Sequence, residues 1–258
     1  MDVRDRTPGP VDPSVLTLQD THRSVDVWNL TGDVAKPLQC RHYRTPWVVH
    51  DRCLEYVTYA GFGGVHRLGF REIDRHLVTT LVERWRQETH SFHLPVGEAT
   101  VTLWDVAILT RLPVQGTAVT GSFLVDPVGL VVRVLGVQPG PNDVRGSALR
   151  TIWLRDTFQG LPADADDATV QRYARAYLFF LISGVVFGNK SGSHLQLIYL
   201  QLLDHDWEHI RGYSWGSASL AVLYRQLCRA SRSGALEIGG PLFVLQVYYV
   251  YYHKRIMQ

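Results

Sequence analysis

The stretch LVERWRQETHSFHLP, from Leu81 to Pro95, and the following VGEATVTLWDVAILTRLPV, up to Val114, decide the expected fold. The first part continues an amphipathic helix, because apolar side chains recur every four residues on one face of such a helix. These side chains are Ile73, Leu77, Leu81 and Trp85. The spacing therefore predicts a helix that ends at the polar residues 88–90 and buries Trp85 in the core.

The second part of this stretch predicts a short strand, a turn and another helix. Phe92 and Leu94 alternate with polar neighbours, which is typical of a half-buried strand. Thr102 and Asp105 have the spacing of a capping box, in which two side chains satisfy backbone N–H groups at a helix start. We therefore expect a helix from this cap to about Leu112.

The rest of the chain also has mainly helical patterns. Periodicity predicts further helices over residues 41–59, 147–158, 170–186, 195–203, 217–230 and 241–254, whereas residues 125–137 are ambiguous. Residues 1–35 contain three prolines and are expected to form an extended N-terminal arm. Residues 36–258 are expected to form one mainly α, multi-helix globular domain with at most a small β-hairpin.

Composition and charge limit the classes of function. Of the 258 residues, 46% are hydrophobic, which favours a packed globule, and the formal net charge of +2 gives no overall attraction to nucleic acid. The cysteines, Cys40, Cys53 and Cys228, follow no secretory segment and are expected to be free thiols. The longest apolar runs are too short to cross a bilayer, so we expect a soluble intracellular protein that does not bind membranes.

Five tracts carry a family resemblance, and the most specific is Leu81–Val114. The others are residues 9–29, 59–64, 175–192 and 213–231. Together they resemble the plant mobile domain, which occurs in transposon-encoded proteins and in related host proteins. The resemblance implies a largely helical nuclear domain that acts beside a phosphatase-like partner in transposon silencing and gene expression. The final residues, YYVYYHKRIMQ, depart from the family pattern, which indicates truncation or divergence at the C-terminus.

Our first hypothesis for function is a non-enzymatic protein-interaction module. Its contact surface is expected to include the polar turn between the two predicted helices, because an element held from both sides presents its side chains in a defined geometry. Arginine and histidine there offer charge-assisted hydrogen bonds to a partner. The residues of this predicted contact turn are Arg86, Glu88, Thr89, His90 and His93.

An alternative hypothesis is binding of DNA or chromatin. It predicts a stripe of arginines on one face and a steep dependence of affinity on salt. The candidate residues are Arg71, Arg75, Arg84, Arg86 and Arg111. The excess of arginine over lysine suits bidentate phosphate contacts, although a GC-rich coding sequence explains it as well.

A third hypothesis is a relic enzyme, which requires a pocket lined by histidines and carboxylates with perturbed pKa values. Two polar clusters are candidates, although a solvated helix start or surface explains each of them as well. They are Asp164, Asp166 and Asp167, and the group Asp204, His205, Asp206, Glu208 and His209. Neither cluster locates a nucleophile. Metallophosphatase segments are absent, and Lys190, the one lysine with a plausible setting for a Schiff base, falls in a predicted loop, so we expect no enzymatic activity and no cofactor.

Three weaker patterns concern metals and phosphate, and a structural explanation exists for each. Residues 184–191 match a phosphate-binding loop, except that Asn189 replaces the last glycine. Two sets contain side chains of the types that bind zinc, but without the spacing of a zinc finger. They are Cys40, His42, His50 and Cys53, and the set Glu88, His90, His93 and Glu98. We therefore expect no metal site.

The aromatic residues have two expected roles. Tryptophans in or next to predicted helices are expected in the core, namely Trp85, Trp104, Trp153, Trp207 and Trp215. The tyrosines at 248, 249, 251 and 252 occupy more than one side of the last helix, so they cannot all be buried together. Exposed tyrosines beside Arg255 are expected to form a protein-binding face.

Overall fold

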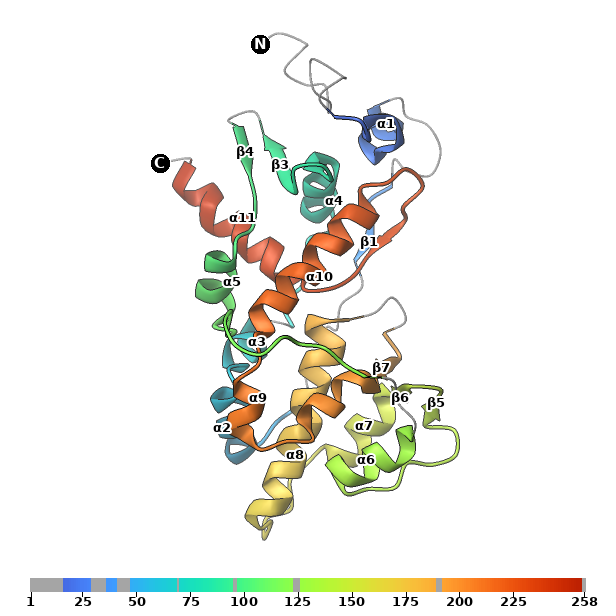
Figure 1. Cartoon of the computed structure of the whole chain (residues 1–258), viewed down its shortest axis with the longest axis vertical. Helices are drawn as coiled ribbons and strands as arrows, with labels where there is room; N and C mark the ends of the chain where they lie inside the picture. The colour runs from blue at the N-terminus through green and yellow to red at the C-terminus, as the bar shows by residue number, and fades with distance from the viewer. Residues whose placement is uncertain are drawn as a thin grey trace.

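The computed structural model describes residues 16–28, 36–40, 47–68, 70–94, 97–122, 126–188 and 192–256. Within these residues the fold is mainly helical, as the sequence predicted, and its strands are short (Figure 1). No helix in this part of the chain is long and apolar enough to cross a membrane.

The block that decided the prediction contains two helices joined by a small sheet. Helix α4 (Arg75–Arg84) begins at Asp74, whose carboxylate accepts hydrogen bonds from two backbone N–H groups of the first turn. It ends before Trp85, because strand β2 (Trp85–Arg86) pairs with β3 (Ser91–Leu94). Trp85 is fully buried, as predicted, although it belongs to the strand and not to the helix.

The predicted cap and second helix are confirmed. Strand β4 (Gly97–Ala99) pairs antiparallel with β3 and leads into helix α5 (Leu103–Thr110). Thr102 and Asp105 form both hydrogen bonds of the capping box. The helix ends slightly earlier than predicted, because Arg111 adopts the left-handed conformation (φ 62°) that often follows a helix.

Helix α8 (Asp167–Phe180) lies at the centre of the apolar core and continues into a π-helical segment, η4 (Leu181–Val186). Its start is capped by Asp166, whose carboxylate accepts from the N–H of Thr169, as expected for an acidic helix start. Every residue from 176 to 188 is buried, so this segment has no exposed face. The helices packed on α8 are α2 (Asp51–Tyr59), α6 (Pro127–Leu135) and α7 (Thr151–Phe158).

The limits of these three helices differ from the sequence pattern at their starts. Helix α2 starts ten residues later than predicted, at Asp51, with the ring of His50 as its cap. The ambiguous residues 125–137 contain helix α6, because Asp126 caps it and Pro127 occupies its first turn, where no N–H is required. Helix α7 starts at Thr151, because the residues before it form a strand.

The strands form three small sheets, more than the single hairpin that the sequence predicted at most. One is β2-β3-β4. The second is antiparallel and contains β5 (Val144–Arg145), β6 (Ala148–Arg150) and β7 (His194–Gln196). The third is a parallel pair, β1 (Gln39–Cys40) and β8 (Glu237–Ile238). These strands are too short for a visible alternation, and several of them pair with residues distant in sequence.

The C-terminal helices complete the domain. Helix α10 (Trp215–Ala230) packs on α5, and α11 (Leu242–Ile256) packs on both α5 and α4. The residues predicted as a helix over 195–203 form the end of β7 and two 3-10 turns, η5 (Leu197–Tyr199) and η6 (Gln201–Leu203). The remaining helices are α3 (Gly63–Leu68) and α9 (Trp207–Arg211).

Residues 16–28 are not part of an extended arm. They form a 3-10 turn, η2 (Gln19–Thr21), and helix α1 (Arg23–Trp28), which packs on α4. His22, Arg23 and Ser24 are buried. The upstream prolines did not reveal this arrangement, because the polar groups that hold these residues are distant in sequence. Residues 1–15 and 29–35 of the predicted arm lie outside the described residues.

The aromatic residues follow the predictions in part. Trp85 and Trp215 are fully buried, but Trp104 is 72% exposed, so its assignment to the core was wrong. Helix α5 is apolar on both faces, and the sequence therefore does not show which face is covered. Tyr248 and Tyr249 pack against the core, and Tyr251 is exposed. The side chains of Tyr252 and Arg255 lie outside the described residues.

Candidate functional site

The predicted contact turn connects β2 to β3, and a hydrogen-bonded network holds it. Glu88, Thr89 and His90 are exposed. The hydroxyl of Ser91 donates to Glu98 Oε2 (2.8 Å), so the Thr89 hydroxyl is the donor in its 2.6 Å contact with Ser91. The turn therefore presents polar side chains in a defined arrangement, as a contact surface requires.

His90 fixes the tip of this turn against helix α10. Its backbone φ is 51°, a left-handed value that is uncommon for a residue other than glycine. The imidazole stacks on the ring of Tyr224, with centroids 5.5 Å apart, and the Thr100 hydroxyl donates to the His90 carbonyl oxygen at 2.7 Å. His93 is half-buried and lies opposite Glu98 on the neighbouring strand.

Arg86 does not belong to this exposed surface, because its side chain is only 1% exposed. The prediction that it contacts a partner from the surface was therefore wrong for the chain in this state. Arg86 lies beneath residues of the N-terminal segment, which the sequence had placed in an extended arm. The place of Arg86 in the sequence, next to an exposed turn, does not determine whether its side chain points towards solvent or into the core.

Residues 16–28, the N-terminal segment, dock on a surface formed by Glu83, Trp85, Arg86, Glu88 and residues 231–235, which we call the docking surface. Glu88 Oε1 accepts a hydrogen bond from the Leu18 N–H at 2.8 Å. His22 Nε2 lies 2.8 Å from the Trp85 carbonyl oxygen and must donate to it, because a carbonyl has no proton. The predicted contact turn and the N-terminal segment are thus parts of one site.

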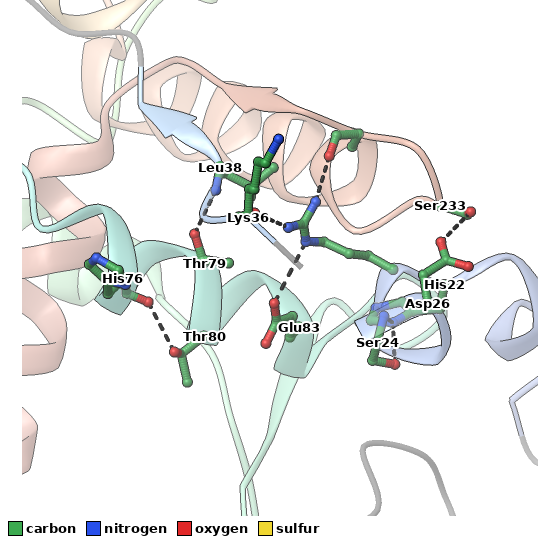
Figure 2. Close-up of polar contacts among 12 residues, drawn as sticks. His22, Ser24, Asp26, Lys36, Leu38, His76, Thr79, Thr80, Glu83 and Ser233 are labelled. Carbon is green, nitrogen blue, oxygen red and sulfur yellow. Dashed lines mark hydrogen bonds and ion pairs between the residues drawn. The ribbon is translucent and has the colours of Figure 1, made fainter. Parts of the chain in front are cut away.

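Arg23 is a second anchor of the N-terminal segment. Its guanidinium donates to the carbonyl oxygens of Ala235 (2.5 Å) and Lys36 (2.7 Å), and its Nε lies 3.7 Å from Glu83 Oε1. Figure 2 shows Glu83 on α4 facing the segment that carries His22 and Asp26. Burial raises the pKa of Glu83, and the charge of Arg23 opposes this increase.

Backbone hydrogen bonds extend the contact along the turn after α10. The Arg23 N–H donates to the Ser231 carbonyl oxygen (2.7 Å), and the Ser233 N–H donates to the Thr21 carbonyl oxygen (2.8 Å). The Ser233 hydroxyl also donates to the carboxylate of Asp26 (Figure 2). These main-chain bonds form an isolated antiparallel bridge between His22 and Arg232, and side chains provide the further anchors.

His22 is neutral in this site. Its pKa is lowered to about 4, first because burial disfavours the charged ring and second because the guanidinium of Arg86 repels it. Its Nε2 donates to Trp85, and its Nδ1 accepts from the Ser24 hydroxyl at 2.7 Å. Arg86 Nη1 lies 3.4 Å from both ring nitrogens. Neither nitrogen has an acceptor site left for it, because Nε2 carries a proton and Nδ1 already accepts from Ser24.

The five arginines proposed for nucleic-acid binding do not share one exposed stripe. Arg86 is buried and Arg84 is half-buried. Arg75 is exposed, but its Nε donates to the Leu38 carbonyl oxygen at 3.2 Å. Arg71 and Arg111 are exposed on separate elements, before α4 and after α5.

The polar clusters proposed for a relic enzyme line two pockets beside α8. A pocket of about 570 Å³ contains Asp204, His205 and Asp206, but Asp204 pairs with Arg133 and Asp206 caps helix α9. A second pocket, of about 400 Å³, contains Asp167, whose pKa is lowered by hydrogen bonds from Tyr56 and then Gln171. These three carboxylates thus have structural partners.

The groups proposed for zinc also have other partners. His50 caps α2, and the Cys53 thiol donates to the Val170 carbonyl oxygen at 3.7 Å. Burial raises the pKa of both Cys53 and Cys40 to about 11, so both are protonated thiols at neutral pH. His42, Asn189 and Lys190 lie outside the described residues. Among the residues that are described, no three potential metal ligands cluster together.

A second exposed feature lies on helices α5 and α11. Leu103, Trp104 and Ile108 are exposed on α5, and Val250 and Tyr251 are exposed on α11. The two helices pack together, and β4 of the contact-turn sheet leads directly into α5 (Figure 1). We call these five exposed side chains, which lie on two helices that pack together, the α5–α11 apolar face. Clusters of exposed apolar side chains are typical of protein interaction sites.

Sequence reasoning missed His22 and Arg23, which complete the site. The run THRSVDVW lies in a tract that resembled the family, but the expectation of an extended arm obscured it. A helical spacing of Ser24, Val25 and Trp28 was the available signal. No pattern within the sequence pairs Arg23 with Glu83, because the two are joined only by the fold.

Comparisons with known proteins identify the family and several relatives of the chain. The family model described as Plant mobile domain matches residues 61–258. The chain is 45% identical over 249 residues to an Arabidopsis thaliana protein named "Serine/threonine-protein phosphatase 7 long form homolog", covering 95% of the chain and 18% of that protein. No solved structure matches the chain.

Two further Arabidopsis thaliana relatives have similar coverage. "Protein MAIN-LIKE 1" is 38% identical over 255 residues, covering 96% of the chain and 49% of that protein. "Protein MAINTENANCE OF MERISTEMS" is 35% identical over 248 residues, covering 94% of the chain and 51% of that protein. The chain spans about half of these two relatives, and less than a fifth of the phosphatase-named one. Because the family model matches most of its length, the chain belongs to the plant mobile domain family.

Proposed function

We propose that this plant mobile domain is a non-enzymatic nuclear protein-interaction module. Its partner in this proposal is a phosphatase-like protein, and its role is in transposon silencing and gene expression. The observation that carries the interaction role is the α5–α11 apolar face, where Trp104 alone is 72% exposed. Aromatic side chains supply much of the binding energy at protein interfaces.

The position of this face supports the proposal. The contact turn, with exposed Glu88, Thr89 and His90, belongs to the sheet whose last strand leads into α5. An apolar centre beside a polar rim is the usual anatomy of a protein interface. A relative named as a phosphatase 7 long form homologue contains a similar domain, which supports a phosphatase-like protein as the partner class.

The test is recovery of partners from plant nuclear extract by the full chain, with and without nuclease treatment. We expect the chain to recover a phosphatase-like protein both with and without nuclease. This recovery is expected to be lost when Trp104 and Ile108 are both changed to Ala. The matched control is Ile152→Ala, which removes an exposed apolar side chain from helix α7, on a different part of the molecule (Figure 1).

Two results would overturn the proposal. Recovery of nucleic acid alone, lost at high salt, would favour the DNA-binding hypothesis. Recovery of the same protein by the wild type and the double variant would show that the α5–α11 apolar face is not the contact.

A further inference from the structure

Arg86 is the one group of the docking surface that the N-terminal segment leaves poorly satisfied. Its Nε and Nη2 are buried and have no hydrogen-bond partner, and no described carboxylate forms an ion pair with it. The group facing it is the neutral ring of His22, whose two nitrogens are already engaged. The carboxylates of Glu88 and Glu98 attract this guanidinium, but neither is hydrogen-bonded to it, and unpartnered buried N–H groups in a native structure require an explanation.

The N-terminal segment itself is held mainly by polar contacts. Of its apolar side chains Leu16 is buried and Val25 and Val27 are half-buried, whereas Leu18 is 41% and Trp28 is 51% exposed. Its anchors, His22 and Arg23, bind main-chain carbonyl groups, which any peptide of suitable shape is able to reach. A competing peptide is able to replace these contacts, because main-chain carbonyl groups accept hydrogen bonds from donors of any sequence.

We propose that the docking surface is a binding site for an acidic segment of a protein partner, which enters in place of residues 16–28 and pairs a carboxylate with Arg86. The His22 ring lies 3.4 Å from Arg86 Nη1, so a carboxylate in its place is positioned to accept from Nη1 and from the neighbouring unpaired Nη2 in an end-on bidentate arrangement. Residues 16–28 of the same chain then compete with the partner segment for this site. This inference rests on the proposed interaction function, but its test requires no knowledge of the natural partner.

The binding test uses two labelled peptides with the sequence of residues 16–28, one native and one carrying His22→Glu. Each is titrated into the full chain carrying Arg23→Ala, which weakens the resident segment, and binding is followed by fluorescence anisotropy. We expect the affinity of the glutamate peptide to be at least about tenfold higher than that of the native peptide, which is the gain expected from one charge-assisted hydrogen-bonded pair. Adding Arg86→Met to the protein is expected to remove this preference.

Three outcomes would overturn the inference. These are equal affinity of the two peptides, a preference that survives Arg86→Met, and no binding of either peptide. If Arg86→Met does not fold, His22→Glu in the full chain provides a second measurement. In this His22→Glu variant we expect slower hydrogen exchange at residues 18–26 than in the wild type. Faster exchange would contradict the preference of Arg86 for an anion.

Discussion

The core around α8 and the docked N-terminal segment bury their side chains by different means. Around α8 and η4, residues 176–188 are covered on all sides by apolar groups such as Leu154 and Leu203. In the N-terminal segment the buried side chains are Leu16, His22, Arg23 and Ser24, and the three polar ones bind carbonyl oxygens, one carboxylate and one another. Apolar burial is non-directional and stabilises the whole domain, whereas directional polar contacts stabilise one position of one segment. Four predictions test this comparison.

The largest effect is expected at Trp85, which belongs to both regions. Its ring packs against Phe92 (4.9 Å between centroids) and Tyr224 (5.1 Å), and its carbonyl binds His22. Trp85→Ala is expected to lower the free energy of unfolding by about 3–5 kcal/mol, as the loss of a buried aromatic ring does. Urea unfolding followed by circular dichroism measures it, and an unchanged midpoint would contradict this core assignment.

The second effect is a pH dependence confined to the N-terminal segment. The pKa of His22 is about 4 in the folded state, below its ordinary value near 6.5, so the unfolded segment binds more protons between these pH values. The attachment of the segment is therefore complete above about pH 6.5 and is lost progressively as the pH falls towards 4. The expected loss is at most about 3 kcal/mol, because one pKa unit corresponds to about 1.4 kcal/mol.

Hydrogen exchange at residues 18–28 measures this dependence, with the amides of α8 as the internal reference. The charged groups that act on His22 are Arg86 and Glu88 of the contact-turn hairpin. In His22→Gln, the pH dependence over this range is expected to flatten. If residues 18–28 and α8 lose protection together, the two regions unfold as one unit and the contrast between them does not hold.

The third effect is local and smaller. Arg23→Ala removes hydrogen bonds to Ala235 and Lys36 and leaves Glu83 without its cation, so the attachment of residues 16–28 is expected to weaken by about 2 kcal/mol. Arg52→Ala is the matched control, because Arg52 also donates to a carbonyl oxygen (Ala165, 2.9 Å) but is exposed. Hydrogen exchange should accelerate at residues 16–28 only in Arg23→Ala, and equal effects of both variants would rule out an anchoring role.

The smallest effect on stability is expected at Trp104. Because its side chain is 72% exposed, Trp104→Ala should change the free energy of unfolding by less than about 0.5 kcal/mol. Thermal unfolding measures this change, in direct contrast to Trp85→Ala. A large loss of stability would mean that Trp104 is covered in solution, by another part of the chain or by a second copy.

Local patterns predicted a large part of the fold. The sequence predicted the capping box at Thr102 and Asp105, the acidic start of α8 and the burial of Trp85, because each depends on residues close in sequence. The contact turn was also placed correctly between two elements. Short strands such as β1 and β8 were not predicted, since two-residue strands have no detectable alternation.

The sequence by itself determined that this protein is a mainly helical plant mobile domain, because helix periodicity and caps are local properties and the family tracts are long. Only the tertiary structure decided that Trp104 is exposed, that Arg86 is buried and that His22 and Arg23 belong to the same site as the contact turn. The physical reason is that burial and hydrogen-bond partners depend on residues more than sixty positions apart, which only the packing of α1 on α4 and β2 brings together.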